Sequence, residues 1–363
     1  MKIAIVHDYL NQLGGAEQVL QSLLKLFPDA PVYTIIADYS ILPERIRKAD
    51  IRTSFIQNIP FSKRHYKKLL PLFPLAVEQF DLRGYDVILS SSSAFAKGVL
   101  TFPHQTHICY CYTPMRYIWD LYHDYMKETI RNPLYRLVLP GVLHRIRLWD
   151  QLNAQRVDHF IADSNHVAKR IKKYYNREAA VIYPPVNADR FRLSDGDDGY
   201  YLIVSRLLPY KRVDLAIEAF NRLRRPLVII GDGYDRKRLE KMAGPTVRLL
   251  GRLPDEETAA YFSRCKAFIM PGEEDFGITP LEAQASGRPV IAYARGGALE
   301  TVIDGETGVF FREPTAESLM EAVGRLERMT FDRNRLRQHA LSFNEDRFLS
   351  EIEAFLKKHA AYQ

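Results

Sequence analysis

The chain has 363 residues, 47% of them hydrophobic, and a formal net charge of +7. This length and composition predict a globular protein of about two domains. The sequence contains no run of about 20 apolar residues, the length that is needed to span a bilayer. The apolar run Lys2–Val6 is too short for a signal peptide. We therefore expect a cytoplasmic protein whose positive charge favours an anionic partner, namely a nucleotide, a phospholipid surface or a nucleic acid.

The cysteine pattern gives no covalent framework. The three cysteines are Cys109, Cys111 and Cys265, an odd number with one pair only two positions apart. No His-Cys spacing resembles a zinc site. We expect Cys109 and Cys111 on a buried strand in a reducing compartment.

Short apolar runs alternate with amphipathic ones in the first half of the chain. A helix is predicted over Gly15–Phe27. The predicted strands are Lys2–Val6, Pro31–Ile36, Val87–Ser90, Thr106–Cys111, Phe160–Ala162 and Ala180–Ile182. Strands separated by helical segments predict a parallel, doubly wound sheet.

A polar segment that contains Pro184-Pro185 and Asp195-Gly-Asp-Asp-Gly199 interrupts this pattern, and a second series of strands and helices follows it. The predicted second-half strands are Tyr201–Val204, Leu227–Ile230, Val247–Leu250, Ala267–Met270, Val290–Tyr293 and Gly308–Phe311. The predicted helices between them are Asp214–Leu223, Arg236–Met242, Glu256–Ser263 and Pro280–Ser286.

These two series predict an α/β fold of two Rossmann-like, doubly wound domains, residues 1–183 and 200–344, joined by a linker at 184–199. We expect the domains to face each other across a cleft at the carboxyl ends of both sheets. A last helix, predicted at Arg347–Lys358 within residues 345–363, is expected to pack back on the first domain.

Two glutamates, Glu274 and Glu282, lie eight positions apart in PGEEDFGITPLEAQASGRPVIA. Pro280 cannot lie inside a helix that begins at Glu274, so we predict a strand, a loop that carries Glu274, and a helix with Thr279 as its N-cap. Glu282 as the third helical residue would complete a capping box, which is the simplest explanation of this residue. Alternatively, a carboxylate in the loop binds sugar hydroxyls, and one on the first helical turn accepts hydrogen bonds from a ribose diol.

Three positions offer binding groups for a phosphate. Arg206 and Lys211 follow the first strand of the second half, where a doubly wound domain places a phosphate, although both cations are also consistent with solvated surface charge. Gly231 ends the next strand and leaves its backbone open to a ligand, or forms a simple turn. Gly14-Gly15 lies at a strand-to-helix turn, where N–H groups and the helix dipole favour phosphate; a tight turn explains it equally well.

The Glu274–Glu282 loop, together with Arg206, Lys211 and Gly14-Gly15, resembles the retaining glycosyltransferases of family 4, which have the GT-B fold, and in particular bacterial polysaccharide and O-antigen mannosyltransferases. The resemblance extends from Lys2 to about Phe311. It implies that Glu274 contacts the donor sugar near C3 and C4. Glu282 would hold the ribose.

The same resemblance implies a donor site built from both halves. Arg206 and Lys211 would grip the diphosphate and act with Glu274 in catalysis, and Gly14-Gly15 would approach the diphosphate from the other domain. Arg252 would lie near the base. The remaining residues expected to bind the donor are Gly231, Phe276, Gly277, Ile278 and Thr279, the last three through N–H groups aimed at an anion.

The acceptor side departs from the family pattern. Many members carry a His before Thr-Pro or Ser-Pro after a first-domain strand, close to the donor 6-hydroxyl, whereas CYCYTPMRYIWD has Tyr112 there. A phenol donates a hydrogen bond but is not cationic near neutral pH, so a role that needs an imidazole is missing or has moved. His104 and His107 are near in sequence only. The acceptor-side candidates are Lys97, which would meet an acceptor phosphate, Tyr112 and Arg116; packing alone also explains Tyr112.

Asp195-Gly-Asp197 resembles the metal-binding D-x-D of the other glycosyltransferase fold, but no strand precedes it. We therefore assign it to the linker and expect no metal and no cofactor besides the nucleotide-sugar substrate.

Residues 61–73 combine Lys63, Arg64, Lys67 and Lys68 with leucine and phenylalanine, which is typical of an interfacial segment. A second basic stretch, Arg131 to Arg147, would join it. A helix with a solvated charged face explains the pattern as well. The interfacial interpretation places the protein peripherally on the inner face of the cell membrane.

The sequence thus predicts a retaining, metal-independent hexosyltransferase with a glycan acceptor, lipid-linked, in cell-surface polysaccharide synthesis. The resemblance favours mannose from GDP-mannose. Two other functions stay open: a nucleotide-sugar epimerase of the same fold, and a non-catalytic nucleic-acid-binding protein. Only the net charge suggests the second, and no recognised nucleic-acid-binding module is present.

Overall fold

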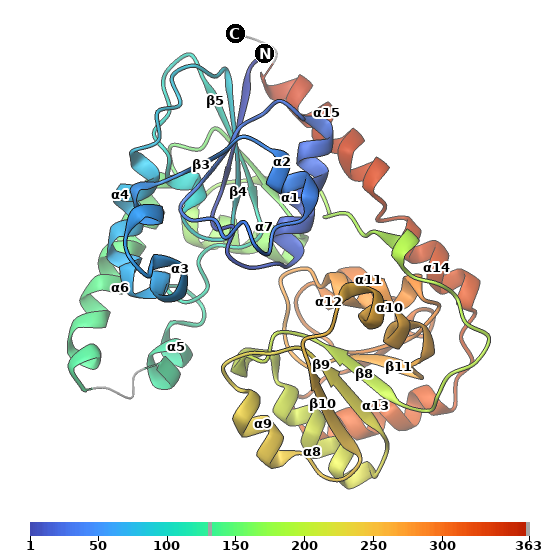
Figure 1. The fold of residues 1–363 in the computed structure, drawn as a ribbon. Helices are drawn as coiled ribbons and strands as arrows, with labels where there is room; N and C mark the ends of the chain where they lie inside the picture. Colours follow the sequence, from blue (N-terminus) through green and yellow to red (C-terminus); the bar gives the residue numbers. More distant parts are fainter. Residues whose placement is uncertain (130–132, 361–363) are drawn as a thin grey trace. The chain divides into compact units, whose positions relative to one another are not determined.

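The computed structural model of the protein describes residues 1–129 and 133–360. The chain forms two compact units. One contains Met1–Tyr183 and the chain from Phe348 onward, and the other contains Pro184–Arg347. Each unit is a parallel sheet with helices on both faces (Figure 1). This confirms the predicted α/β architecture of two Rossmann-like sheets.

The first unit contains a seven-stranded sheet in the order β3-β2-β1-β4-β5-β6-β7. Its strands are β1 (Ile3–His7), β2 (Val32–Thr34), β3 (Ile51–Thr53), β4 (Val87–Ser92), β5 (Thr106–Cys111), β6 (His159–Ala162) and β7 (Ala179–Val181). Its helices are α1 (Gly15–Leu26), α2 (Glu44–Lys48), α3 (Ser62–His65), α4 (Phe73–Glu78), α5 (Tyr122–Thr129), α6 (Pro133–Asn153), α7 (Asn165–Tyr175) and α15 (Glu345–Ala360).

Apolar residues cover both faces of this sheet, as expected for parallel strands between helices. On one face Ile5 and Leu89 pack against α1 and α15, whose Phe348 and Ile352 are fully buried. On the other face α4 and α6 cover β1 and β4. The edge strand β3 was not predicted, because three residues with an exposed Arg52 in the middle give no apolar run.

The second unit contains a six-stranded sheet in the order β10-β9-β8-β11-β12-β13. Its strands are β8 (Tyr201–Val204), β9 (Leu227–Ile230), β10 (Val247–Gly251), β11 (Ala267–Met270), β12 (Val290–Tyr293) and β13 (Gly308–Phe311). Its helices are α8 (Val213–Leu223), α9 (Arg236–Met242), α10 (Asp255–Arg264), α11 (Ile278–Ala285), α12 (Ala298–Thr301), α13 (Ala316–Glu327) and α14 (Arg333–Leu341). Helices α8 and α13 cover one face, and α10, α11 and α14 cover the other.

The segment 184–199, which its composition marks as a linker, belongs to the second unit. Phe191 is buried there and meets Phe262 edge-on, with ring centroids 5.5 Å apart. Arg333 donates hydrogen bonds to the carbonyl oxygens of Ser194 and Asp195 at 2.6 and 2.9 Å. Backbone carbonyls that bind guanidinium groups fix this polar stretch on the domain surface, which sequence composition does not reveal.

Candidate functional site

The strongest candidate site lies at the carboxyl edge of the second sheet, on the neighbouring strands β8 and β11. Lys211 lies in the loop after β8, and its ammonium forms a salt bridge with Glu274 in the loop after β11. Both side chains are largely buried. Burial alone lowers the pKa of Lys211, but the Glu274 carboxylate outweighs it, so the pKa of Lys211 is raised and the amine stays charged.

Arg206 lies in the same loop after β8 and is exposed. Its charge acts on Lys211 and lowers the pKa of that amine, so the two cations interact electrostatically. The structure therefore brings together Arg206, Lys211 and Glu274, three residues chosen from the sequence as one group. A guanidinium and an ammonium group at this edge are the cationic groups that bind an anionic ligand such as a phosphate.

Paired glycines hold Glu274 in place. The amide of Gly297 donates to the Glu274 carbonyl oxygen at 2.9 Å. A Cβ on Gly296 would lie 2.3 Å from that oxygen, and the positive φ of Gly296, 63°, also disfavours other residues. Gly296-Gly297 was not among the residues predicted for the site. Its recognisable feature in the sequence is a pair of glycines between a strand and a helix.

The start of α11 differs from the prediction. Gly277, with φ 89°, is the N-cap, Ile278 is the first helical residue, and no side chain caps the helix. The predicted capping box of Thr279 and Glu282 is therefore wrong, because the chain turns into the helix at the glycine, two residues before Thr279. The backbone N–H groups of Ile278 and Thr279 remain in the first turn, where the helix dipole favours an anion.

Phe276 is not exposed to a ligand. Its side chain is buried and packs against Phe343, with ring centroids 5.9 Å apart. The ring belongs to the core beneath the loop, so the predicted contact of Phe276 with the donor would use its backbone. It anchors the loop between Glu274 and α11.

Glu282 is a half-buried carboxyl on α11. Burial raises the pKa of Glu282 to about 7, while nearby Arg190 lowers it and Asp255 raises it. The pKa of this carboxyl lies near neutral pH, and Glu282 does not cap α11. Both observations are consistent with a ligand-binding role.

The ends of β9 and β10 complete this edge. Gly231 follows β9 with φ 138°, and a Cβ there would lie 1.8 Å from the carbonyl oxygen of Ser205. Only glycine fits between these two strand ends. Arg252 follows β10 and is exposed. Because parallel strands end at one edge, Arg206, Gly231, Arg252 and Glu274 all belong to the same edge of the sheet.

In the first unit, the turn Gly14-Gly15 begins α1, with Gly14 as its N-cap. Nearby, Asp8 follows β1 and is buried. Its carboxylate accepts hydrogen bonds from the backbone amides of residues 93–96 at 2.6 to 2.9 Å, and from the Ser93 hydroxyl at 3.0 Å. Asp8 therefore fixes the loop after β4. This structural role of Asp8 was not predicted from the sequence.

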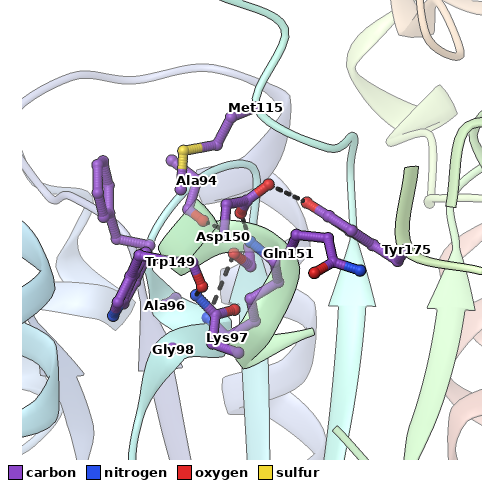
Figure 2. Close-up of polar contacts among 12 residues, drawn as sticks. Ala94, Ala96, Lys97, Gly98, Met115, Trp149, Asp150, Gln151 and Tyr175 are labelled. Carbon is purple, nitrogen blue, oxygen red and sulfur yellow. Dashed lines mark hydrogen bonds and ion pairs between the residues drawn. The ribbon is translucent and has the colours of Figure 1, made fainter. Parts of the chain in front are cut away.

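Lys97 at the end of that loop is buried and does not face solvent, which corrects its expected role at an acceptor phosphate. Figure 2 shows its ammonium between the Ala94 carbonyl oxygen, at 2.9 Å, and the Asp150 carboxylate, with which it forms a salt bridge. Asp150 also accepts from the Tyr175 hydroxyl at 2.9 Å (Figure 2). It accepts from the Trp119 indole at 2.8 Å as well. The charge on Lys97 is thus compensated by Asp150 inside the domain.

The hydroxyl of Tyr112 donates to the carbonyl oxygen of Ala16 at 3.2 Å, and the hydroxyl of Ser91 is 2.8 Å away. Burial raises the pKa of Tyr112 well above its ordinary value, so the phenol stays neutral. His107 is buried, and burial lowers its pKa to about 3, whereas His104 is exposed. Neither takes the place of the missing imidazole at position 112.

Arg116 belongs to a second charged cluster, in the chain after β5. Its Nε lies 3.6 Å from the Asp120 carboxylate, which accepts from Arg170 at 2.9 Å. Arg170, on α7, also donates to the Thr113 hydroxyl at 3.3 Å. Asp120 therefore links Arg116 to Arg170 on α7. Arg170 was not predicted, because α7 is distant in sequence from the Thr113–Arg116 motif.

The basic segment 61–73 is less exposed than expected. Phe73 is fully buried, and Leu69 and Leu70 pack against the same core, so these residues are not available for apolar contact with a membrane. The exposed apolar residues of the segment are Phe61, at 80%, and Leu72, at 37%. In the second basic stretch, Arg131 lies outside the described residues. Exposed apolar residues of α6 include Leu137, Val138, Leu148 and Leu152.

Within residues 1–129 and 133–360, no helix is long and apolar enough to cross a membrane. Over the same residues, no three His, Cys, Asp or Glu side chains are grouped so that they could hold a metal ion.

Two family models match consecutive parts of the chain. The family model described as "Glycosyltransferase Family 4" matches residues 13–190, and the one described as "Glycosyl transferases group 1" matches residues 187–343. The chain is 23% identical over 337 residues to the uncharacterized glycosyltransferase MJ1178 of Methanocaldococcus jannaschii, covering 89% of this chain and 87% of that protein.

A second relative is the "GDP-mannose-dependent alpha-(1-6)-phosphatidylinositol monomannoside mannosyltransferase" of Mycolicibacterium smegmatis, 32% identical over 195 residues. That match covers 45% of this chain and about half, 51%, of the mycobacterial enzyme.

Among solved structures, HepE of Anabaena in complex with UDP has a TM-score of 0.72 at 19% identity and covers 99% of this chain and 100% of HepE. Sucrose-phosphate synthase of Thermosynechococcus elongatus has a TM-score of 0.77 at 17% identity and covers 100% of both chains. These likenesses show the fold. With one family model on each half of the chain, the protein belongs to the glycosyltransferases of the GT-B fold.

Proposed function

We propose that this glycosyltransferase moves mannose from GDP-mannose, with retention at C1, to a lipid-linked glycan acceptor in cell-surface polysaccharide synthesis. The observation that carries the proposal is the joining of Lys211 and Glu274 at the carboxyl edge of β8 and β11, with Arg206 beside them. The donor named in the mycobacterial relative's description supports the choice of GDP-mannose.

In the proposed mechanism, the protein contributes mainly electrostatic stabilisation. Arg206, Lys211 and the first turn of α11 stabilise the charge that develops on the departing diphosphate. Glu274 holds the donor sugar, and Glu282 accepts hydrogen bonds from the ribose. The acceptor hydroxyl attacks from the side of the leaving group, so that a phosphate oxygen takes its proton. No enzyme nucleophile and no metal take part.

Arg116 and Arg170 support an anionic acceptor. Their guanidinium groups both lie against the Asp120 carboxylate, in the chain after β5. A phosphate of a lipid-linked glycan would add a second anion to this cluster, and planar guanidinium groups bind phosphate oxygens in pairs.

We further propose that the protein binds an anionic membrane from its cytoplasmic side. The exposed cations Lys63 and Lys68, with the exposed ring of Phe61, support this surface. Exposed leucines on α6, among them Leu148 and Leu152, would add apolar contact.

A panel of nucleotide sugars in a thermal-shift assay tests the donor, because a ligand at 100 times its dissociation constant adds about 2.7 kcal/mol to the free energy of unfolding. GDP-mannose should give the largest shift. Incubation with the donor alone should yield no epimer, and salt-sensitive binding of oligonucleotides without any donor shift would instead indicate a nucleic-acid-binding protein. Transfer should continue in EDTA; loss of activity that magnesium or manganese restores would refute the metal-independent mechanism.

A further inference from the structure

A closed ring of polar groups joins three neighbouring strands of the first unit to the start of α1. His7 ends β1, and Ser91 lies beside it in register on β4. The His7 Nδ1 is 2.9 Å from the Ser91 hydroxyl, which is 2.8 Å from the Tyr112 hydroxyl after β5. Tyr112 reaches the carbonyl oxygen of Ala16 at 3.2 Å. The next residue, Glu17, closes the ring with its carboxylate 3.6 Å from the His7 Nε2.

The ring is shielded from water. His7, Glu17 and Ser91 are buried, and Tyr112 is half-buried. Its groups must therefore satisfy one another, since an unpaired buried donor or acceptor costs free energy. This requirement allows the protons in the ring to be counted.

The direction of every hydrogen bond follows from the Ala16 carbonyl, which can only accept. Tyr112 must donate its single proton there, and its raised pKa keeps that proton on the phenol. Ser91 must then donate its own proton to the Tyr112 oxygen. Having no proton left for His7, Ser91 can only accept, so the His7 Nδ1 must carry a hydrogen.

The second imidazole nitrogen, Nε2, lies 3.6 Å from the Glu17 carboxylate. This distance is too long for a hydrogen bond, so the contact orients the imidazole toward α1 without fixing a second proton.

We propose that this ring is a positioning device for the Gly14-Gly15 turn, and that it holds the His7 imidazole with a proton on Nδ1. The link to the turn is direct, because Ala16 and Glu17 both lie in the first turn of α1, immediately after Gly15. The consequence for donor binding rests on the proposed function and on the expectation, drawn from the family resemblance, that the Gly14-Gly15 turn approaches the diphosphate. Position 112 carries a tyrosine instead of the family's histidine, and the imidazole of this ring belongs to His7.

The protonation state can be tested without activity, by nitrogen-15 NMR of histidine in the intact protein. The chain has ten histidines, and the His7 signals are identified by their loss in His7→Gln. We expect a proton on Nδ1, because Ser91 can only accept from it. In Glu17→Gln, Nδ1 should keep that proton, because Glu17 makes no hydrogen bond to it. A neutral ring with its proton on Nε2 and a bare Nδ1 in the parent protein would overturn the proposal.

The positioning role is tested by Ser91→Ala and Tyr112→Phe, which remove single hydroxyls. Each should raise KM for the nucleotide sugar about three- to tenfold, the size expected for one lost hydrogen bond, with kcat changed less than about twofold. Ser91→Thr, which restores a hydroxyl, should recover most of the affinity.

The matched control is Ser90→Ala. Ser90 is the neighbouring buried serine of β4, and its hydroxyl also contacts an imidazole, the Nε2 of His107, at 2.9 Å on the opposite face of the sheet. It should leave donor KM unchanged. Equal KM changes in Ser90→Ala and Ser91→Ala would overturn the positioning role. If no nucleotide sugar binds even the parent protein, the proposed function fails, while the NMR result still decides the protonation of His7.

Discussion

Lys211 and Glu274 form a salt bridge between two loops that are 63 residues apart in the chain. Neighbouring parallel strands bring them together, because β8 and β11 pair directly and both loops leave the same edge. Without substrate, the carboxylate neutralises the amine. A bound diphosphate would compete with Glu274 for Lys211 and release the carboxylate toward the sugar.

Glu274→Gln should reduce transfer by about 10²- to 10³-fold, the typical effect of removing one preorganised polar group from a transition state. Affinity for the free nucleoside diphosphate should stay the same or increase, because Lys211 loses a competing anion. Calorimetry and initial rates measure the two effects. Glu273→Gln, in the same loop, is the control with the same chemical change. Parallel losses of nucleotide affinity and turnover in Glu274→Gln would refute the assigned role.

Arg206→Ala and Lys211→Ala should each weaken binding of the nucleoside diphosphate about ten- to hundredfold and binding of the nucleoside very little, since a charge-assisted hydrogen bond contributes about 1.5–3 kcal/mol. Arg212→Asn is a suitable control, because it removes a neighbouring cation and asparagine tolerates the left-handed backbone at this position, φ 53°. Normal diphosphate binding by both alanine variants would mean that the phosphate lies elsewhere.

Nucleoside binding should strengthen as the pH rises through about 7. Burial raises the pKa of Glu282 to about 7, and only the ionised carboxylate accepts two hydrogen bonds from a ribose diol. Glu282→Gln should bind more weakly and lose this pH dependence. Titrations between pH 6 and 8 measure it, and an unchanged pH profile in the variant would contradict the ribose role.

The raised pKa of Glu282 also predicts that the stability of the protein depends on pH. Stability should fall as the pH rises, whereas nucleoside binding should strengthen. Because the folded-state pKa lies above the ordinary value of 4.5, the folded protein binds the proton more tightly than the unfolded chain. Its contribution to stability should therefore fall as the pH rises from about 4.5 to about 7. Glu282→Gln should remove that part of the pH dependence, as measured by urea unfolding.

Lys97→Met should destabilise the protein by about 3–5 kcal/mol, because it leaves Asp150 as a buried carboxylate without its cationic partner. Transfer per folded molecule should remain close to that of the parent. Urea unfolding and rates normalised to folded protein measure these effects. The double variant Lys97→Met, Asp150→Asn should recover part of the stability. A stable Lys97→Met with a raised acceptor KM would return this lysine to the acceptor site.

Changing Lys63, Arg64, Lys67 and Lys68 to Glu should release the protein from anionic vesicles. Each cation near a negatively charged leaflet contributes about 1 kcal/mol, and the attraction should weaken as salt rises. Transfer to a lipid-linked acceptor should fall, and transfer to a water-soluble analogue should not. Vesicle sedimentation measures binding. The control changes four exposed cations of the second unit, Lys241, Arg248, Arg312 and Arg328. Unchanged vesicle binding by the first variant, or none by the parent at low salt, would end this proposal.

The sequence alone determined the two parallel sheets, because each buried strand is a short apolar run bounded by turns, as at Leu227–Ile230 and Ala267–Met270. It also placed Arg206, Lys211 and Glu274 after strands of one sheet, and parallel strands necessarily present such loops at one edge. The same reasoning misplaced the start of α11, since both Gly277 and Thr279 are acceptable N-caps and only the path of the chain selects between them.

Tertiary structure decided which charges are available to a ligand. Lys97 and Lys211 both follow a strand, yet Lys97 is buried against Asp150 from α6, a partner 53 residues away that local sequence does not reveal. The ring of His7, Ser91, Tyr112 and Glu17 likewise depends on the register of β1, β4 and β5. Local periodicity fixes the type of each element, whereas the pairing of distant polar groups is fixed only when the strands align and water is excluded.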